Sequence, residues 1–189
     1  MAGRSIVRAS LLSACTLVVA ACASGPDIRT TVNPAVDFAN YSTFAFFDPL
    51  GTDRGEYASL LSQTLKSATR RELESRGYRY DPSSPDLLVN FGAQLAEKTQ
   101  VTQTPTMGYG GYYGYRGAFY GGWPAYQTDV RQYTEGTLNI DLVDAARREL
   151  VWEGVAVGRV SEKVLEDREA AINAAVTEIF SRFPYTASR

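Results

Sequence analysis

Histidine is missing from this chain of 189 residues, which removes the usual ligand of mixed His and Cys zinc sites and the base of His-dependent catalytic triads. Cysteine occurs only twice, as Cys15 and Cys22, and both lie too close to the N-terminus to form a disulfide framework. A surplus of positive charge is also missing, since 19 Lys and Arg stand against 21 Asp and Glu. This balance excludes the basic footprint of a nucleic-acid-binding protein. The 44% of hydrophobic residues is ordinary for one globular domain.

The chain begins with a short positive segment followed by an apolar one. Arg4 and Arg8 precede the apolar or small residues 9–21, and no acidic residue occurs before Asp27. A membrane-spanning helix needs about 20 apolar residues, so this run is too short to span. It has the pattern of a secretory signal peptide.

The apolar run ends in Val19-Ala20-Ala21-Cys22, which resembles the lipobox of bacterial lipoproteins. Leu12-Ser13-Ala14-Cys15 has a similar pattern, but cleavage there would leave too short an apolar segment. The resemblance implies that residues 1–21 are removed, that Cys22 receives the lipid, and that residues 22–27 form a tether. Ala23 follows Cys22 where an inner-membrane retention signal would have aspartate, which implies transport to the periplasmic face of the outer membrane. An ordinary cleaved signal peptide and a buried structural Cys22 are the alternatives.

Lipid, rather than charge, would attach the mature protein to the membrane. Removal of residues 1–21 takes away two basic residues and no acidic one, so the net charge changes from −2 to −4. An acidic chain is not attracted to anionic lipid headgroups. Each buried CH₂ of an acyl chain contributes about 0.8 kcal/mol, so several chains anchor a protein stably.

Hydrophobic patterns predict a single α+β domain over residues 28–185. Segments with strand-like alternation or short apolar runs are 28–32, 43–47, 86–101, 133–143 and 150–160, and apolar residues recur at helical spacing in 55–76 and 161–182. Residues 78–80 are expected to form only a short extended piece after the first helix. Neighbouring strands joined by hairpins favour a mainly antiparallel sheet, with both amphipathic helices packed on one face. Trp152 is expected in the core, with Gly154 allowing close backbone approach. Asp141 and Asp144 are expected to accept backbone hydrogen bonds at the hairpin turn.

One segment between two predicted strands has an unusual composition. Residues 107–126 hold seven glycines and eight aromatic residues, which predicts a flexible loop inserted in the sheet. Three interpretations are open: a flexible loop without a binding role, a surface that binds other molecules, and stacking on single-stranded nucleic acid. The scarcity of cations disfavours the third. The candidate binding residues are Tyr109, Tyr112, Tyr113, Tyr115, Arg116, Phe119, Tyr120 and Trp123.

No motif of a known reaction is present. The sequence has no phosphate-binding glycine loop, no nucleophile elbow and no calcium loop. We therefore expect no catalytic residue, no metal and no cofactor. A hydrolase of envelope glycans that uses carboxylates such as Glu135, Asp141 and Glu153 remains a distant alternative.

Several short motifs together resemble a family of bacterial lipoproteins. They are Asp37-Phe38, Tyr41, Thr43-Phe44-Ala45-Phe46, Gly77-Tyr78, Pro85-Asp86-Leu87-Leu88-Val89, Glu135-Gly136-Thr137-Leu138, Ile140-Asp141-Leu142-Val143-Asp144, Leu150-Val151-Trp152-Glu153-Gly154 and Phe183-Pro184. With the lipobox, they are similar to the family of the domain of unknown function 4136. The resemblance implies a location and a fold, but it supplies no catalytic residue.

These observations predict an outer-membrane lipoprotein that faces the periplasm and binds rather than catalyses. Its expected partners are the membrane, through the lipid, and an envelope protein or polymer, with no nucleic acid. The alternative is a structural or stress-related envelope component without a discrete ligand.

Overall fold

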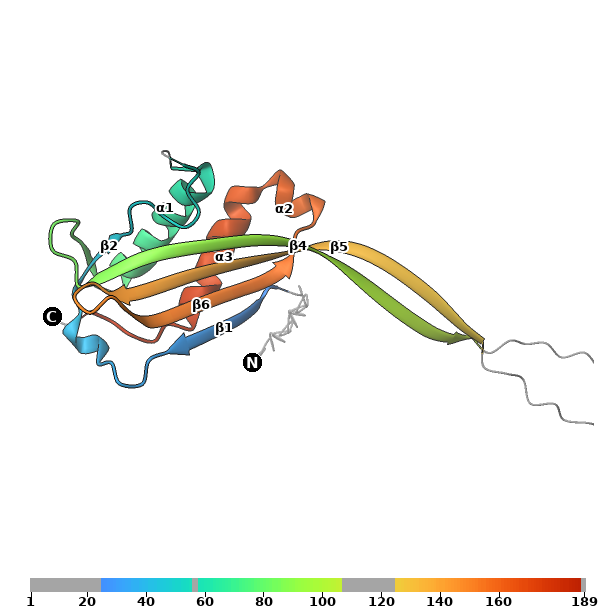
Figure 1. Cartoon of the computed structure of the whole chain (residues 1–189), viewed down its shortest axis with the longest axis horizontal. Helices are drawn as coiled ribbons and strands as arrows, with labels where there is room; N and C mark the ends of the chain where they lie inside the picture. The colour runs from blue at the N-terminus through green and yellow to red at the C-terminus, as the bar shows by residue number, and fades with distance from the viewer. Residues whose placement is uncertain (1–24, 56–57, 107–124, 188–189) are drawn as a thin grey trace, which may run out of the picture.

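The alternating segments pair into one sheet in the computed structural model, which describes residues 25–55, 58–106 and 125–187 (Figure 1). This part of the chain contains six strands, three α-helices and one 3-10 helix. In chain order they are β1 (Asp27–Val32), η1 (Phe38–Asn40), β2 (Thr43–Phe46), α1 (Leu60–Ser75), β3 (Arg79–Tyr80), β4 (Leu87–Thr106), β5 (Ala125–Asp144), β6 (Glu149–Arg159), α2 (Glu162–Glu166) and α3 (Arg168–Ser181).

The sheet is mixed, so the prediction of a mainly antiparallel sheet is wrong. Its strand order is β1-β6-β5-β4-β2-β3. The pairs β1–β6, β6–β5 and β5–β4 are antiparallel, whereas β4–β2 and β2–β3 are parallel. The parallel edge arises because α1 connects β2 to β3 as a crossover, which brings the chain back in the same direction.

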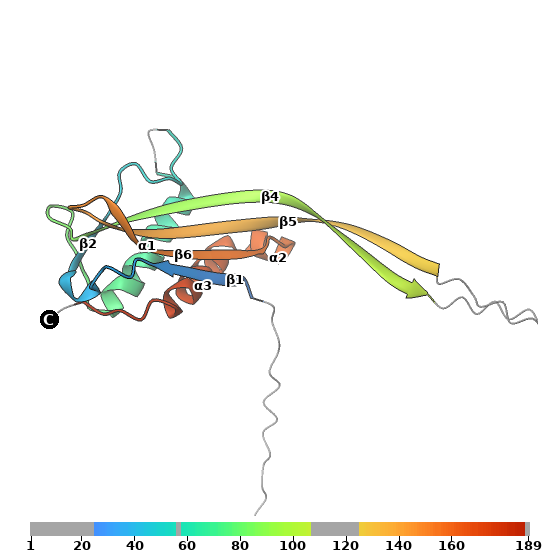
Figure 2. The same cartoon turned by 60° about the horizontal axis from the view of Figure 1, so that its bottom comes forward.

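The helices α1 and α3 lie on the same side of the sheet (Figure 2). The final helix, predicted as one element over 161–182, is divided at Asp167 into α2 and α3. Asp167 ends α2 and is the N-cap of α3, where its side chain accepts a hydrogen bond from the Ala170 N–H at 3.1 Å. A carboxylate in that role satisfies an otherwise unpaired helical N–H, which favours a new helix start over continuation.

The core lies between the sheet and these helices, and its centre is aromatic. Trp152 is 2% exposed, and its ring lies 5.6 Å from the ring of Phe180 and 5.1 Å from that of Phe183. A Cβ atom at Gly154 would come within 2.5 Å of the Trp152 ring and would also collide with Ile179. The predicted roles of Trp152 and Gly154 are therefore confirmed.

Candidate functional site: a two-stranded arm

The strands β4 and β5 extend far beyond the rest of the sheet and form an arm (Figure 1). We define the arm as residues 97–106 of β4 and 125–134 of β5, which pair from Glu97↔Thr134 to Thr106↔Ala125. The strand β6 pairs with β5 only from Glu135 onward, so the arm has no third strand in the described part of the chain. At about 3.3 Å per residue, the arm is roughly 33 Å long.

One face of the arm carries its exposed apolar side chains. Val101 and Val130 are register partners and therefore lie on the same face, where they are 57% and 59% exposed. Tyr126 lies farther along the same face and Leu95 lies at its base. By the two-residue period of a strand, this is the continuation of the face that carries Val89 under the helices. We call it the apolar arm face.

The opposite arm face is polar and internally paired. Lys98 forms an ion pair with Glu135 at 3.6 Å, and Arg131 forms one with Asp129 at 3.3 Å. The guanidinium of Arg159 lies over the Tyr133 ring, 4.0 Å from its centroid. This face can therefore remain in water, whereas the apolar face gains from being covered.

A ribbon of two strands is an incomplete structural unit. Isolated two-stranded hairpins are marginally stable in water, and a third strand or a packed face normally stabilises them. Both outer edges of the arm also offer backbone N–H and C=O groups that can pair with another strand. The arm thus combines two features that favour contact with another molecule.

The residues of the sequence motifs, in contrast, hold the body of the fold together. Asp86 lies at the start of β4, and its Oδ2 accepts hydrogen bonds from Ser42 N–H at 2.8 Å and from Thr43 N–H and hydroxyl at 2.9 Å. These bonds join the beginnings of the parallel strands β2 and β4. Burial opposes ionisation of Asp86, but the hydrogen bonds outweigh it and lower the pKa of Asp86 below its ordinary value.

A second motif carboxylate, Asp144, fixes the turn between β5 and β6. The Tyr41 hydroxyl donates to Asp144 Oδ2 at 2.8 Å, and the Arg147 N–H donates to Oδ1 at 2.7 Å. Burial again opposes ionisation, yet these hydrogen bonds and the charge of Arg147 lower the pKa of Asp144 below its ordinary value. The prediction that Asp144 accepts backbone hydrogen bonds at the turn is confirmed.

The prediction for Asp141 is wrong, because its side chain accepts no backbone hydrogen bond and its Oδ1 has no partner among the described residues. Asp141 lies directly opposite Glu153 on the sheet face away from the helices. Burial, followed by the charge of Glu153, raises the pKa of Asp141 above its ordinary value. Glu135 lies on the same face, six residues away along β5 and roughly 20 Å distant.

The predicted binding residues lie outside the described residues. They are Tyr109, Tyr112, Tyr113, Tyr115, Arg116, Phe119, Tyr120 and Trp123, and the lipidation candidate Cys22 also lies outside. Of the predicted insert 107–126, the last two residues belong to β5, so this strand begins earlier than the sequence predicts. Thr106 and Ala125, which flank the segment, are register partners at the end of the arm.

Comparison with known proteins assigns the family. The model of the domain of unknown function DUF4136 matches residues 28–185. The chain belongs to the DUF4136 family. No curated protein matches it. The family description names no activity, so the match confirms the resemblance without adding a site to the DUF4136 domain.

Solved structures match the chain at low sequence identity, and one with a TM-score above 0.5 shares the fold. A PDZ domain protein from Parabacteroides distasonis ATCC 8503 matches with a TM-score of 0.53 and 18% identity, over 84% of this chain and 35% of that protein. The DUF4136 chain therefore spans about a third of that protein's length. Two structures of a PelC dodecamer from Paraburkholderia phytofirmans match with TM-scores of 0.46 and 0.44, at 10% and 11% identity. They cover 85% and 87% of this chain, and 98% and 99% of theirs.

Sequence reasoning missed the apolar arm face. Val101 was placed at the end of a predicted strand, and Val130 was placed in no element. The available signal was the β-branched composition of residues 99–106, which is typical of a strand even without a buried face.

In the part of the DUF4136 chain that the structure describes, no helix is long and apolar enough to cross a membrane. Within the same residues, no group of three or more His, Cys, Asp or Glu side chains is arranged to hold a metal ion.

Proposed function

We propose that this DUF4136 protein is a lipid-anchored interaction module of the bacterial cell envelope, which binds a partner protein through its arm. The observation that carries the proposal is the apolar arm face, where Val101 and Val130 lie side by side on a ribbon without a third strand. Full burial of a valine side chain contributes about 1.5–3 kcal/mol, so covering this pair can provide a substantial part of a binding energy.

A protein fits the arm better than a polar polymer does. A partner strand can pair with an open edge of β4 or β5 and place its own apolar side chains on the same face. A polysaccharide offers neither a strand edge nor a continuous apolar surface. Capture of a polymer by the arm is therefore the outcome that would contradict this part of the proposal.

The anchor in the proposal rests on the sequence of residues 1–23 alone. Cys22 would carry the lipid, and Ala23 would direct the protein to the periplasmic face of the outer membrane. We expect Cys22→Ala to remain unprocessed or to leave the membrane fraction, as measured by metabolic labelling with a fatty acid and by cell fractionation. A Cys22→Ala protein that is cut normally and sediments with membranes contradicts the anchor.

In-cell photo-crosslinking tests the arm directly. A photoreactive residue at Val101 or Val130, in the full chain in its own cell, is expected to give one discrete protein adduct. The matched control is Thr102, the next residue along β4, which faces the opposite side of the same arm. Equal adducts from Val101 and Thr102, or none from either, contradict the proposal.

A second candidate function is hydrolysis by carboxylates, and one observation favours it. Asp141 and Glu153 are opposed across β5 and β6, and the raised pKa of Asp141 would keep it protonated to a higher pH than usual. Neighbouring carboxyls with separated pKa values are typical of acid and base pairs in glycosidases. Loss of glycan cleavage in Asp141→Asn would support this candidate, whereas unchanged glycan cleavage by this variant would exclude it.

An envelope component without a discrete ligand is the remaining alternative. It predicts that variants of the apolar arm face restore every phenotype of a deletion strain as well as the wild type does. The crosslinking comparison above separates it from the proposed function.

A further inference from the structure

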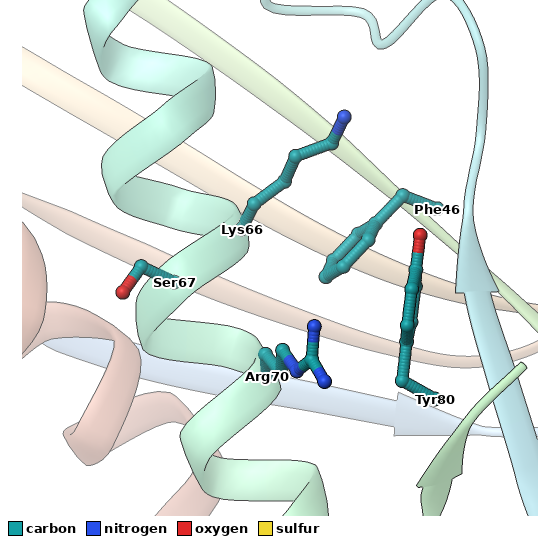
Figure 3. Close-up of a pocket in the computed structure, with 5 residues that line it drawn as sticks. All are labelled: Phe46, Lys66, Ser67, Arg70 and Tyr80. Atoms are coloured by element: carbon teal, nitrogen blue, oxygen red, sulfur yellow. The ribbon is translucent and has the colours of Figure 1, made fainter.

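A small pocket lies between α1 and the parallel edge of the sheet, at the opposite end of the sheet order from β1 (Figure 3). It has a volume of about 340 Å³ and is lined by Phe46, Lys66, Ser67, Arg70 and Tyr80. Phe46 ends β2 and Tyr80 ends β3, so the two rings stand side by side, with their centroids 5.8 Å apart. Volumes of a few hundred Å³ are typical of sites for small molecules.

The helix α1 directs two cations toward these rings. Lys66 and Arg70 are four residues apart and therefore lie on the same side of the helix. The Lys66 Nζ lies 5.6 Å from the centre of the Phe46 ring, and the Arg70 guanidinium carbon lies 4.6 Å from the centre of the Tyr80 ring. Figure 3 shows both side chains on the ring side of α1, whereas the Ser67 hydroxyl points away from the rings.

Most donors of these two cations have no partner in the described part of the chain. Lys66 forms no hydrogen bond or ion pair with a described residue, and Arg70 uses only its Nε, which donates to Glu74 Oε1 at 2.7 Å. Asp53 is also near Lys66; its Oδ2 accepts from Leu50 N–H and its Oδ1 has no partner among the described residues, but it forms no ion pair with Lys66 there. The Lys66 ammonium and both terminal guanidinium nitrogens of Arg70 are thus available to an anion.

Packing against the aromatic rings explains the positions of the Lys66 and Arg70 side chains only in part. Stems of Lys and Arg commonly lie on apolar surface with their charges in water. The two like charges on one side of the helix repel each other, however, and a bound anion would reduce the repulsion. The guanidinium fork suits a carboxylate or a phosphate, and the exposed parts of these half-buried rings can contact the C–H groups of a ring-shaped ligand.

We infer that this pocket binds an anionic sugar, with its carboxylate or phosphate on the unpaired donors of Arg70 and Lys66 and its ring beside Phe46 and Tyr80. A uronic acid and a sugar phosphate share this chemistry. The site is separate from the arm, so its failure would leave the proposed function untouched.

Calorimetric titration of the purified full chain tests the inference, with D-glucuronate, glucose 6-phosphate and glucose as probes. We expect binding of glucuronate or of glucose 6-phosphate, and no binding of glucose. Binding of glucuronate alone identifies the carboxylate as the recognised group, and binding of glucose 6-phosphate alone identifies the phosphate. Absence of binding by both anions, or equal binding of glucose, overturns the inference.

Variants assign the binding to the pocket. Lys66→Gln with Arg70→Gln is expected to weaken the affinity about tenfold or more, because two charge-assisted hydrogen bonds are lost. Lys163→Gln with Arg168→Gln removes the same charges from exposed positions of α2 and α3 and should keep wild-type affinity. Glu74→Gln should strengthen binding, since it frees the Arg70 Nε. An equal loss in both double variants shows a nonspecific charge effect and contradicts the inference.

Discussion

The body of the sheet and the arm are built from the same two strands, yet their side chains are used in different ways. In the body, Phe91 and Ile140 are paired across β4 and β5 and are fully buried under the helices. In the arm, Val101 and Val130 are paired in the same way and remain more than half exposed. The same strand geometry thus buries apolar side chains in one region and exposes them in the other. The body should therefore control stability, and the arm should control binding.

The core of the body should give the largest effect. Trp152→Ala is expected to lower the free energy of unfolding by about 3–5 kcal/mol, because it leaves a cavity among Phe180 and Phe183. Chemical denaturation measures this loss. A loss below 1 kcal/mol would mean that the aromatic centre does not determine the stability of the body.

Loss of the Asp86 hydrogen bonds that join β2 and β4 should give the next largest effect. Asp86→Asn removes the charge that accepts hydrogen bonds from Ser42 and Thr43, and it is expected to cost about 1.5–3 kcal/mol at pH 7. The folded pKa of Asp86 is lowered, so its contribution is present above the unfolded pKa near 4 and is lost as the pH falls through the folded pKa. The unfolding curves of wild type and variant should therefore differ at pH 7 and converge at low pH. A difference that does not depend on pH contradicts this account.

The opposed carboxylates should give a smaller effect of the other sign. Asp141→Asn is expected to stabilise the protein by about 0.2–1 kcal/mol at pH 7, because burial disfavours the charge of Asp141 and the charge of Glu153 across the two strands repels it. The folded pKa of Asp141 is raised, so the penalty appears as the pH rises above the unfolded value, and the gain should vanish in acid. Glu153→Gln is the matched variant and should show the same sign. Destabilisation by both variants would contradict the repulsion between the two carboxylates.

The apolar arm face should give the smallest effect on stability. Val101→Thr with Val130→Thr keeps the shape and the strand propensity of the side chains, and it should change the free energy of unfolding by no more than about 0.5 kcal/mol. The same double variant is expected to lose the protein adduct formed in cells. A large loss of stability would show that the arm face is packed in the free protein.

The sequence predicted the body well where hydrophobic patterns and turn residues act locally. Five of the six strands were predicted, whereas β3 was expected only as a short extended piece, and Gly77 directly after α1 has the positive φ of +90° that is typical of a glycine at a helix C-terminus. The order of strands was not predictable, because alternation shows which face of a strand is buried but not which neighbour it pairs with. The parallel edge depends on the crossover through α1, which a pattern of hairpins does not reveal.

The arm was harder to predict for a physical reason. Sequence patterns identify strands through a buried face, and the arm has no buried face. Residues such as Gln100 and Thr102 alternate with Val101 without a core to select them, so the predicted strand ended near Val101 instead of Thr106. The proposed anionic pocket was also hidden, because α1 brings Lys66 and Arg70 to Phe46 and Tyr80 only in the folded chain.

The segment between Thr106 and Ala125 provides a further comparison within the arm. These two residues are register partners, so an Asn-Gly turn can replace residues 107–124 and close the hairpin. If the described arm carries the binding, this variant keeps the crosslink from Val130. If the aromatic residues such as Tyr113 and Trp123 carry it, as the composition suggests, the crosslink is lost while the fold remains.

Removal of the arm tests the central claim most directly. Ala96 and Glu135 are register partners at its base, so an Asn-Gly turn in place of residues 97–134 leaves the body of the sheet intact. The partner is first identified by crosslinking at Val101 of the full chain. The amount of this partner that copurifies is then measured for the full chain and for the armless chain, and unfolding curves are recorded for both. We predict an armless protein that unfolds cooperatively and has lost the partner. An armless protein that folds and retains the partner, or one that no longer folds, would contradict the division of roles between body and arm.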